Sequence, residues 1–477
     1  MKVFAKKNII KLLAIIFCIA FFLTGCATVS NVTDQNGKKI YFDDVEYFEG
    51  HIAVVGDYLY YGNGYTSSSD EGFNYNDATS SGYLARLNIS NQLKYDYTED
   101  EDGYYNPSPA GIEQVNDEKL IGYQNQYMFA LGEYLYFTSA NTHKTSSLEN
   151  DYSQVSLFRV KFNGDKFKEI DTFRYDENSV ITVQKGSDGN YYYIVYSPTS
   201  SEENPTYNLY SIRIGDKIGD TVTLAEEVKS VAVCDENSTV KNVVYTVDSE
   251  RTEYATDAVK AVDFATGEVS DYGDNNDVVG STTTMLGRVG DVVVYNYSSQ
   301  IVPQGVFYKD ISTGDKHFSG TTKFYTSNST ISDIQTIGDG YMFISDVSSS
   351  VMYKSTLDTT VDAQTLLRSA DYSDILFVDG DWLYYSNDTT ISRINVRDKK
   401  QETLATMTSL ISGQCGYDGN YIYFYAQIEQ ETDGSDSGEG EDGSTETTTD
   451  SKYYMHRVDK EGNVQLLANA DKIKKAE

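Results

Sequence analysis

The sequence predicts an all-β fold, an eight-bladed β-propeller of four-stranded antiparallel blades. The first observation is composition: the 477 residues include 42 Tyr and 36 Gly but only 5 Pro, and 23% are charged. Tyr favours pleated strands, and such a charge content is typical of a globular chain. The second is that apolar residues alternate with a period of two, which argues against helices. The third is one unit of sequence that recurs along almost the whole chain.

The recurring unit is a Gly, Asp or Asn turn followed by an alternating run of aromatic and aliphatic residues. Clear copies occupy residues 56–61, 132–137, 188–193, 290–295, 339–344, 379–385 and 418–424, and a degenerate copy lies at 243–245. The eight units extend from about His51 to about Ala468. We therefore expect eight blades, with seven as the alternative if the degenerate unit merges with a neighbour.

The rest of each unit supplies the other strands. An apolar stretch precedes the run, as at 51–55, and a further strand follows it, as at 391–394. Polar turns such as 263–268 and 310–315 then lead to a fourth strand. Four short strands joined by hairpins, at a period of roughly 40 to 55 residues, are typical of a propeller blade. Residues 39–42 are expected to add a strand that fastens the two ends of the ring, because an open ring leaves unpaired edges.

The first 25 residues have the charge order of an export signal. Before the apolar run Leu12–Leu23 stand four basic residues, Lys2, Lys6, Lys7 and Lys11. The run is short for a membrane span and ends in the sequence Leu23, Thr24, Gly25 and Cys26. These four residues resemble the lipobox of bacterial lipoproteins. The resemblance implies cleavage before Cys26 and attachment of a diacylglyceryl group to its thiol. An ordinary secretory signal or a buried apolar helix is the alternative.

These features divide the chain into segments. We expect a signal peptide at 1–25, a lipidated tether at 26–37, one propeller domain at 38–470 with a disordered acidic insertion at 428–451, and a C-terminal tail at 471–477. Two acyl chains suffice for stable anchoring. The protein is therefore expected to be exported and anchored by lipid to the outer side of the cell membrane, in a Gram-positive bacterium. The tether is short, so the folded body is expected close to the membrane.

Two of the repeated runs carry a resemblance to a known repeat. Residues 342–346 read Met-Phe-Ile-Ser-Asp and residues 383–387 read Leu-Tyr-Tyr-Ser-Asn. Both are similar to the Tyr-Trp-Thr-Asp repeat of propellers of the low-density-lipoprotein-receptor type. The whole chain resembles the receptor-like propeller domains of unknown function on exported lipoproteins of Gram-positive bacteria. The resemblance implies a fold and no particular activity.

The charge of the chain bears on its partners. It has 38 basic and 72 acidic residues, a net charge of -34, which becomes -38 when the four signal lysines are removed. Such a surface repels phosphate backbones, and the basic residues are scattered along the sequence. Nucleic acid is therefore not expected as a partner. We also expect no cofactor and a monomer.

The cysteines fit an exported chain. Cys18 leaves with the signal and Cys26 carries the lipid, so Cys234 and Cys415 remain in the folded body. These two fall in the fourth and eighth units, which lie opposite one another in a ring of eight. A disulfide needs α-carbons within about 7 Å. The repeat therefore predicts two separate, largely buried free thiols.

Long insertions point to one face of the ring. Residues 62–82, 138–154 and 427–452 are read as connections between second and third strands, and residues 97–123 as a connection between blades. All four are then expected on the same face, in the neighbouring units eight, one and two. Loops on a rigid scaffold often carry recognition, and aromatic rings stack on sugars or peptides. The candidate binding rim consists of Tyr65, Phe73, Tyr75, Tyr83, Tyr104, Tyr105 and Tyr123. The alternative is that these rings only hold the loops against the blades.

No catalytic or metal-binding motif stands out. His51, His143, His317 and His456 fall in different repeats, without the spacing of a zinc site or a catalytic triad, and are expected at the surface. Residues 238–241 match S-x-x-K at a hairpin turn, where no helix brings the lysine to the serine. Oxygen-rich turns at 433–436 and 271–277 lack calcium-loop spacing. We assign no catalytic residue and no metal ligand.

The features together predict a function class. We expect a binding or scaffold protein that is not an enzyme and that presents its loop-rich face to an envelope protein or glycan. The alternative is an envelope polysaccharide hydrolase or lyase, since propellers also host catalysis at the mouth of the central channel. A compact group of acid, base and aromatic residues there would favour the enzyme. A structural or folding-assistance role beside the membrane is a third possibility.

Overall fold

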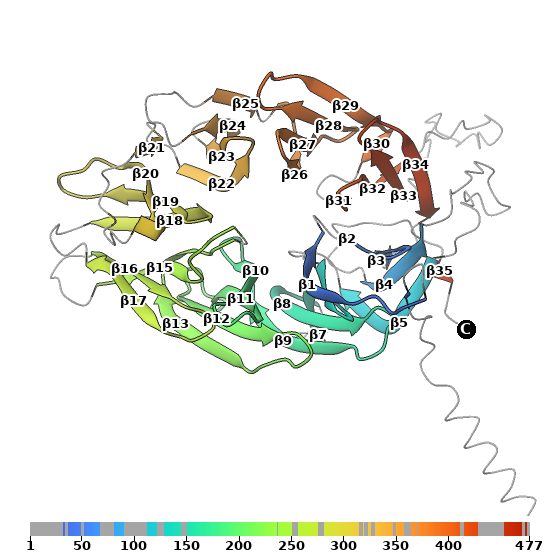
Figure 1. Cartoon of the computed structure of the whole chain (residues 1–477), viewed down its shortest axis with the longest axis horizontal. Coiled ribbons are helices and arrows are strands. Elements are labelled where there is room, and N and C mark those ends of the chain that lie inside the picture. The colour runs from blue at the N-terminus through green and yellow to red at the C-terminus, as the bar shows by residue number, and fades with distance from the viewer. Residues whose placement is uncertain are drawn as a thin grey trace, which may run out of the picture.

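Eight small, mostly antiparallel β-sheets are arranged around a central axis, which confirms the predicted eight-bladed propeller (Figure 1). The structure is a computed structural model. It describes residues 32–33, 37–48, 52–66, 81–89, 112–121, 128–144, 150–235, 237–249, 256–274, 281–313, 318, 323–325, 330–346, 350–356, 364–368, 370–410, 415–427, 453–469 and 473–474. Within these ranges the helical structure is a single 3-10 turn, Ile311–Thr313.

Each blade consists of four consecutive strands, the first nearest the centre (Figure 1). Blade 1 contains β2 (Ile52–Val55), β3 (Tyr58–Thr66), β4 (Ser81–Asn88) and β5 (Ile112–Ile121), and blade 2 contains β6 (Met128–Gly132), β7 (Tyr134–Lys144), β8 (Asn150–Lys161) and β9 (Lys168–Arg174). Blade 3 contains β10 (Val180–Lys185), β11 (Tyr191–Pro198), β12 (Tyr207–Ile214) and β13 (Thr221–Val228), and blade 4 contains β14 (Ser230–Ala232), β15 (Val243–Asp248), β16 (Asp257–Val262) and β17 (Val269–Asp274).

The second half of the ring follows the same plan. Blade 5 contains β18 (Thr282–Val289), β19 (Val292–Ser298), β20 (Gly305–Asp310) and β21 (Lys323–Tyr325), and blade 6 contains β22 (Thr330–Ile337), β23 (Gly340–Asp346), β24 (Ser350–Ser355) and β25 (Gln364–Arg368). Blade 7 contains β26 (Asp374–Asp379), β27 (Trp382–Ser386), β28 (Thr390–Asn395) and β29 (Gln401–Thr406). In blade 8 two short pieces, β30 (Ser409–Leu410) and β31 (Gly416–Tyr417), precede β32 (Tyr421–Gln427), β33 (Tyr453–Asp459) and β34 (Val464–Asn469).

The degenerate unit forms a blade of its own, so the seven-blade alternative is wrong. Strands β14 to β17 pair in chain order as a separate four-stranded sheet. Blades 1 and 2, in contrast, are continuous, because Ile121 of β5 pairs with Ala140 of β7. The long β7 and β8 extend beyond their neighbours and create this joint.

The two chain ends fasten the ring in different places. The N-terminal strand β1 (Phe42–Tyr47) pairs antiparallel with β6, the first strand of blade 2, rather than joining the ends of the ring as predicted for residues 39–42. The C-terminal strand β35 (Ile473–Lys474) pairs parallel with β5, at the outer edge of blade 1. Strand β35, within the segment expected to be the C-terminal tail, therefore helps to close the ring.

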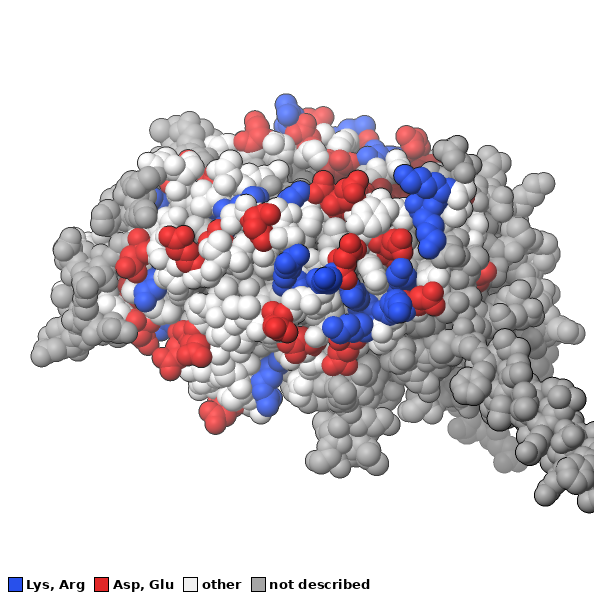
Figure 2. Space-filling model, turned by 60° about the horizontal axis from the view of Figure 1, so that its bottom comes forward, with Lys and Arg blue, Asp and Glu red and all other residues white. Residues whose placement is uncertain are grey.

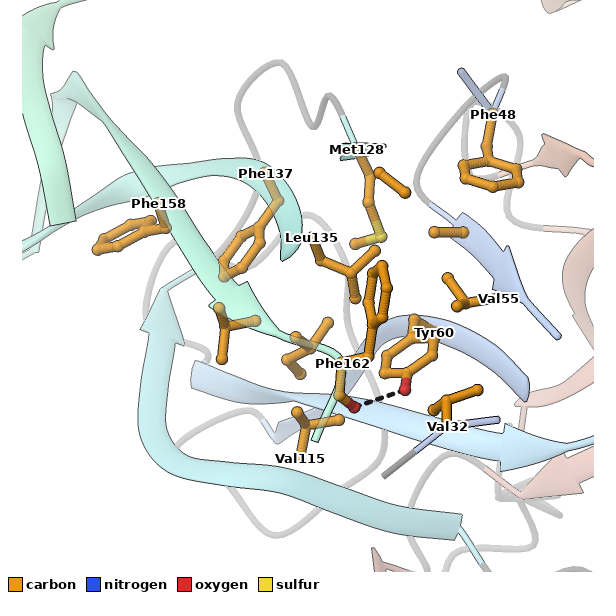
Figure 3. Packing of buried hydrophobic residues seen from close by; sticks show 14 residues of the cluster. Val32, Phe48, Val55, Tyr60, Val115, Met128, Leu135, Phe137, Phe158 and Phe162 are labelled. Atoms are coloured by element: carbon orange, nitrogen blue, oxygen red, sulfur yellow. Dashed lines mark hydrogen bonds between the residues drawn. The ribbon is translucent and has the colours of Figure 1, made fainter. Parts of the chain in front are cut away.

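The core lies between neighbouring blades. Strand alternation turns half of the side chains toward the preceding blade and half toward the next, so each interface is a packed apolar layer. Between blades 1 and 2, Tyr60, Leu135 and Phe162 are buried in one cluster (Figure 3). The Tyr60 hydroxyl donates to the Phe162 carbonyl at 2.6 Å, which ties the blades by a buried hydrogen bond.

The ring has two unlike faces. We define the turn face as the one where the first strand of a blade joins the second and the third joins the fourth, and the loop face as the opposite one. On the turn face the first hairpin is tight in most blades: the turns at Gly56, Gly132, Gly290 and Gly380 each place a glycine at φ between 56° and 64°. An L-residue rarely adopts this conformation, which explains the repeated glycine of the sequence.

One predicted connection lies on the other face. Residues 97–123 were expected to join two blades, but β5 (Ile112–Ile121) pairs with β4 and is the fourth strand of blade 1. The insertion at 90–111 therefore joins third to fourth strand, on the turn face, and only 122–127 joins the blades. The error arose because β5 has the polar sequence Ile-Glu-Gln-Val-Asn-Asp-Glu-Lys-Leu-Ile, which lacks the aromatic alternation of the other strands.

Candidate functional site on the loop face

The candidate rim is divided between the two faces. Tyr65 and Tyr83 belong to β3 and β4, at their loop-face ends, where Asn63 pairs with Tyr83. Phe73 and Tyr75 belong to the connection between these strands, and Tyr123 to the connection between blades 1 and 2; these three residues lie outside the described residues. Tyr104 and Tyr105 also lie outside them, in the connection that starts and ends on the turn face. The prediction of one rim containing all seven rings stays a prediction.

Near the turn-face ends of their strands, blades 1, 2, 7 and 8 share a repeated contact between an arginine of the third strand and the aromatic residue that starts the second. Arg86 of β4 lies 4.2 Å from the ring centroid of Tyr58 and binds Glu113 of β5 at 2.8 Å. Arg457 of β33 lies 4.2 Å from the ring of Tyr421 in the same way. Stacked, hydrogen-bonded guanidinium groups fix the second, third and fourth strands of a blade to one another. The strands that carry the insertions are thus rigidly held.

A polar network at the loop face joins blades 3, 4 and 5. Lys229 binds Asp248 at 2.5 Å and Asp257 at 2.8 Å, and the buried Asp257 also accepts the Thr283 amide at 2.7 Å. Burial opposes ionisation, but the two carboxylates raise the pKa of Lys229 above its ordinary value. Lys229 therefore remains a cation, so this network is an inter-blade lock and not a general base.

A second polar group lies at the inner edge of the ring, where β1 meets blade 3. The Asp44 carboxylate accepts from Lys185 Nζ at 2.5 Å and from the Tyr191 hydroxyl at 2.9 Å. The Lys185 contact lowers the pKa of Asp44, and the same contact raises the pKa of Lys185. We call Asp44, Lys185 and Tyr191 the inner trio. The group combines a carboxylate, an ammonium group and a phenol at the inner edge of the ring. Sequence reasoning missed it because Asp44 comes from the N-terminal strand and Lys185 and Tyr191 come from the third unit.

The S-x-x-K match at 238–241 is part of a network of hydrogen bonds that joins blades 4 and 5. Ser238 Oγ donates to Asp291 at 2.8 Å and accepts from Arg288 Nη2 at 2.7 Å. Arg288 also donates to the carbonyls of Asn242, Val240 and Gly290. This buried guanidinium fastens the long first turn of blade 4 to blade 5, so the serine is held and not activated.

The two cysteines of the folded body and His456 have structural surroundings. Cys234 and Cys415 are both free and buried, as predicted. His456 is buried and stacks on Phe424 with 5.5 Å between ring centroids, so its expected surface position is wrong. Among the residues that the structure describes, no three His, Cys, Asp or Glu side chains form a cluster that fits a metal ion. In the same part of the chain no helix has the length and apolarity of a membrane span.

Comparison with known proteins adds information on the fold. No protein-family model matches the chain, and no curated protein matches it. Among solved structures, a prolyl endopeptidase matches 88% of this chain and 55% of its own at 11% identity, with a TM-score of 0.43. An uncharacterised protein from Listeria monocytogenes matches 72% of this chain and 92% of its own at 12% identity, with a TM-score of 0.36.

Two further matches are enzymes. A puromycin hydrolase matches 71% of this chain and 52% of its own at 10% identity, with a TM-score of 0.41. An oligogalacturonate lyase in complex with manganese matches 81% of this chain and 95% of its own at 9% identity, with a TM-score of 0.29. The chain thus spans about half the length of the prolyl endopeptidase and of the puromycin hydrolase.

These matches correct one prediction. We expected a protein that is not an enzyme, yet the solved structures that resemble the chain include peptidases, a hydrolase and a lyase. A propeller ring is therefore no ground for excluding catalysis. At 8 to 12% identity the likeness concerns the fold and supplies no reaction or substrate for this chain.

Proposed function

We propose that this protein is an exported, lipid-anchored propeller that binds a cell-envelope glycan or protein on the loop face of blades 8, 1 and 2. Cys26 carries the anchor in this proposal, and it lies outside the described residues. The rigid ring supplies the scaffold and the insertions supply the recognition surface. Ligand binding on variable loops above a fixed fold is a common division of labour.

One observation carries the proposal: the longest second-to-third connections leave the loop face from neighbouring blades. They comprise 14 residues in blade 1, at 67–80, and 25 residues in blade 8, at 428–452. In blade 2 the hairpin of β7 and β8 itself is elongated, with Lys144 paired to Asn150. Blades 8 and 1 are adjacent because β35 fastens the C-terminal end to β5. Three insertions therefore start and end at one sector of the face.

The composition of these insertions limits the ligand. Residues 67–80 contain three acidic residues and no basic one, and residues 428–452 contain nine acidic residues and one lysine. A polyanionic ligand would be repelled by this sector. The aromatic residues Tyr65, Phe73, Tyr75, Tyr83 and Tyr123 belong to the same sector and suit stacking on sugar rings or peptide groups. A neutral glycan or a protein with a basic surface fits best.

Binding assays with shortened loops test the proposal. The soluble chain starts at Ala27, because Val32 is part of the core. One variant replaces 68–79 and 429–451 with short Gly-Ser linkers, and the control replaces 91–110 on the turn face. We expect binding to cell-wall glycan or envelope protein to vanish in the first variant and to persist in the control. Equal binding by both variants contradicts the proposal.

An enzyme is the second candidate, and the inner trio supports it. Asp44, Lys185 and Tyr191 bring a carboxylate, an ammonium group and a phenol together at the inner edge of the ring. The alternative function is hydrolysis or elimination of an envelope polysaccharide at this point. Mass spectrometry of glycans incubated with the protein tests it. Products that appear with the native chain and disappear with Asp44→Asn establish the enzyme, whereas unchanged glycans reject it.

A further inference from the structure

The chain enters the ring on the turn face, close to the proposed lipid anchor. Val32 is 4% exposed and belongs to the core between blades 1 and 2. Ile40 packs against the first turn of blade 1, since a Cβ placed on Gly56 would lie 2.6 Å from Ile40 Cδ1. Strand β1 then starts beside Gly132, in the first turn of blade 2, and runs toward the loop face to Tyr47 and Phe129.

The distance from this entry to the anchor is bounded by covalent geometry. Six residue steps separate Cys26 from Val32. An extended chain covers at most about 3.3 to 3.6 Å per residue, so the lipidated residue lies within roughly 20 Å of Val32. The turn face of blades 1 and 2 is therefore held beside whatever surface the lipid enters.

The charge of the turn face differs from that of the chain. The turn-face segments 37–41, 132–133, 161–168, 186–190 and 213–220 of the N-terminal hairpin and of blades 2 and 3 contain seven basic and five acidic residues. The whole chain has 38 basic and 72 acidic residues. The basic members are Lys38, Lys39, Lys161, Lys166, Lys168, Arg213 and Lys217. All of these except the half-buried Lys161 are exposed. Figure 2 shows such a gathering of Lys and Arg side chains, with acidic residues between them.

The long second-to-third insertions, which start and end on the opposite face, are acidic. The loop-face insertions 67–80 and 428–452 hold twelve acidic residues and one basic residue. The turn-face insertion of blade 1, 90–111, is acidic too, with five acidic residues and Lys94, so the basic surface of blades 2 and 3 does not extend over blade 1. Anionic lipid attracts clustered Lys and Arg over about a Debye length and repels acidic segments.

We propose that the turn face of blades 2 and 3 lies against the membrane surface and contacts anionic lipid headgroups, with the loop face directed away from the membrane. The inference rests on the proposed lipid anchor and extends it by assigning an orientation. The anchor holds the ring near the bilayer, and the charge difference between the two faces selects which face meets it.

Two serines of blade 3 allow a matched measurement. Ser187 lies in the first turn, on the turn face, and Ser201 lies between β11 and β12, on the loop face; both are exposed. Ser187→Cys or Ser201→Cys is introduced into the full lipidated protein and labelled with a donor dye. Background labelling is low because Cys234 and Cys415 are buried and burial raises the pKa of both thiols, that of Cys415 to about 12.

Energy transfer to acceptor-labelled headgroups is then measured in vesicles of phosphatidylcholine, with and without phosphatidylglycerol. We expect transfer at least twofold more efficient from residue 187 than from residue 201, and a further rise at 187 with phosphatidylglycerol. The variant Lys166→Glu/Lys168→Glu should lose that rise while staying on the vesicles. Energy transfer that is equal from both positions, or more efficient from residue 201, overturns the proposed orientation. Transfer from residue 187 that does not change with phosphatidylglycerol overturns the proposed headgroup contact.

Vesicle flotation separates this inference from the anchor itself. The lipidated protein should float with vesicles, and the Cys26→Ala protein should not. Failure of the native chain to float rejects the anchor, and with it the orientation. Flotation with equal transfer rejects only the orientation and leaves the proposed recognition by the loop face standing.

Discussion

The two faces of the ring differ in how they tolerate insertions. On the turn face, first hairpins are mostly tight Gly turns with positive φ, and the one long first turn, 233–242, is held by the buried Arg288. On the loop face, second-to-third connections range from three residues in blade 7, 387–389, to 25 in blade 8. The comparison teaches that the first hairpins of the turn face are constrained by packing, whereas the second-to-third connections of the loop face, like the third-to-fourth connection 90–111 of blade 1, accommodate variation.

We expect the largest effect from a substitution that removes the buried hydrogen bonds of Arg288 on the turn face. Arg288→Ala leaves Ser238 Oγ and three carbonyls without the buried donor they now share. We expect the free energy of unfolding to fall by about 3 to 4 kcal/mol, measured by urea denaturation. The control on the loop face is Glu203→Ala, an exposed position, with a change below about 0.5 kcal/mol. Equal losses in both variants would contradict the contrast between the faces.

A pair of glycines sharpens the same comparison within the turn face. At Gly164 (φ 86°) a Cβ would lie 2.0 Å from the Val115 carbonyl oxygen of blade 1, whereas at Gly189 (φ 80°) nothing lies within 4 Å. Gly164→Ala should cost about 3 kcal/mol of unfolding free energy from strain and overlap together, and Gly189→Ala about 1 kcal/mol from strain. Thermal unfolding of both variants checks the difference, and a reversed order would show that the blade contact at Gly164 is loose.

Two adjacent buried tyrosines allow the contribution of a hydrogen-bonded hydroxyl to be compared with that of a hydroxyl without a partner. Tyr60 donates to Phe162 across the first blade interface, while the hydroxyl of the equally buried Tyr61 finds no hydrogen-bond partner in the described part of the chain. Tyr60→Phe should lower the unfolding free energy by about 1 to 1.5 kcal/mol, and Tyr61→Phe should leave it unchanged or raise it slightly. Urea denaturation measures both, and a larger loss for Tyr61→Phe would contradict the packing described here.

The smallest effect is a pH dependence of the unfolding free energy, which arises from Asp291 in the hydrogen-bond network of Arg288 and Ser238. Burial opposes ionisation of Asp291, but hydrogen bonds from Thr239 and Ser238 prevail and hold the pKa of its carboxyl below the ordinary value. Because the folded pKa is lowered, the stabilisation is present above the unfolded pKa, about 3.9, and is lost as the pH falls through the folded value. Asp291→Asn should flatten the acid limb of the stability curve by about 1 kcal/mol. If the loss of stability at acid pH is the same in Asp291→Asn, Asp291 is not its source.

Much of the fold was predictable because its signal repeats. Gly turns and alternating aromatic runs such as 56–61 and 418–424 report the same local geometry in blade after blade. Strand β5 was not recognised because its pairing with β4 depends on contacts such as that of Arg86 with Glu113. No local sequence pattern predicts such a contact. The face of the 90–111 insertion was misassigned for that reason.

The candidate site was less predictable than the fold. Long insertions could be recognised from spacing, but the inner trio joins Asp44 of the N-terminal strand to Lys185 and Tyr191 of the third unit. That contact exists only because β1 adds to blade 2 instead of closing the ring. Likewise, the entry of the chain on the turn face follows from the direction of β1, which the sequence pattern does not encode.

The central claim, that the ring has a membrane side and an exposed side, is tested most directly on cells. Protoplasts that carry the Ser187→Cys or the Ser201→Cys protein are treated with a bulky, membrane-impermeant maleimide, and labelling of each is compared with that of the detergent-solubilised protein. The account predicts ready labelling of residue 201 on the cells and strong protection of residue 187 until detergent is added. Equal labelling of the two positions on intact protoplasts would contradict it.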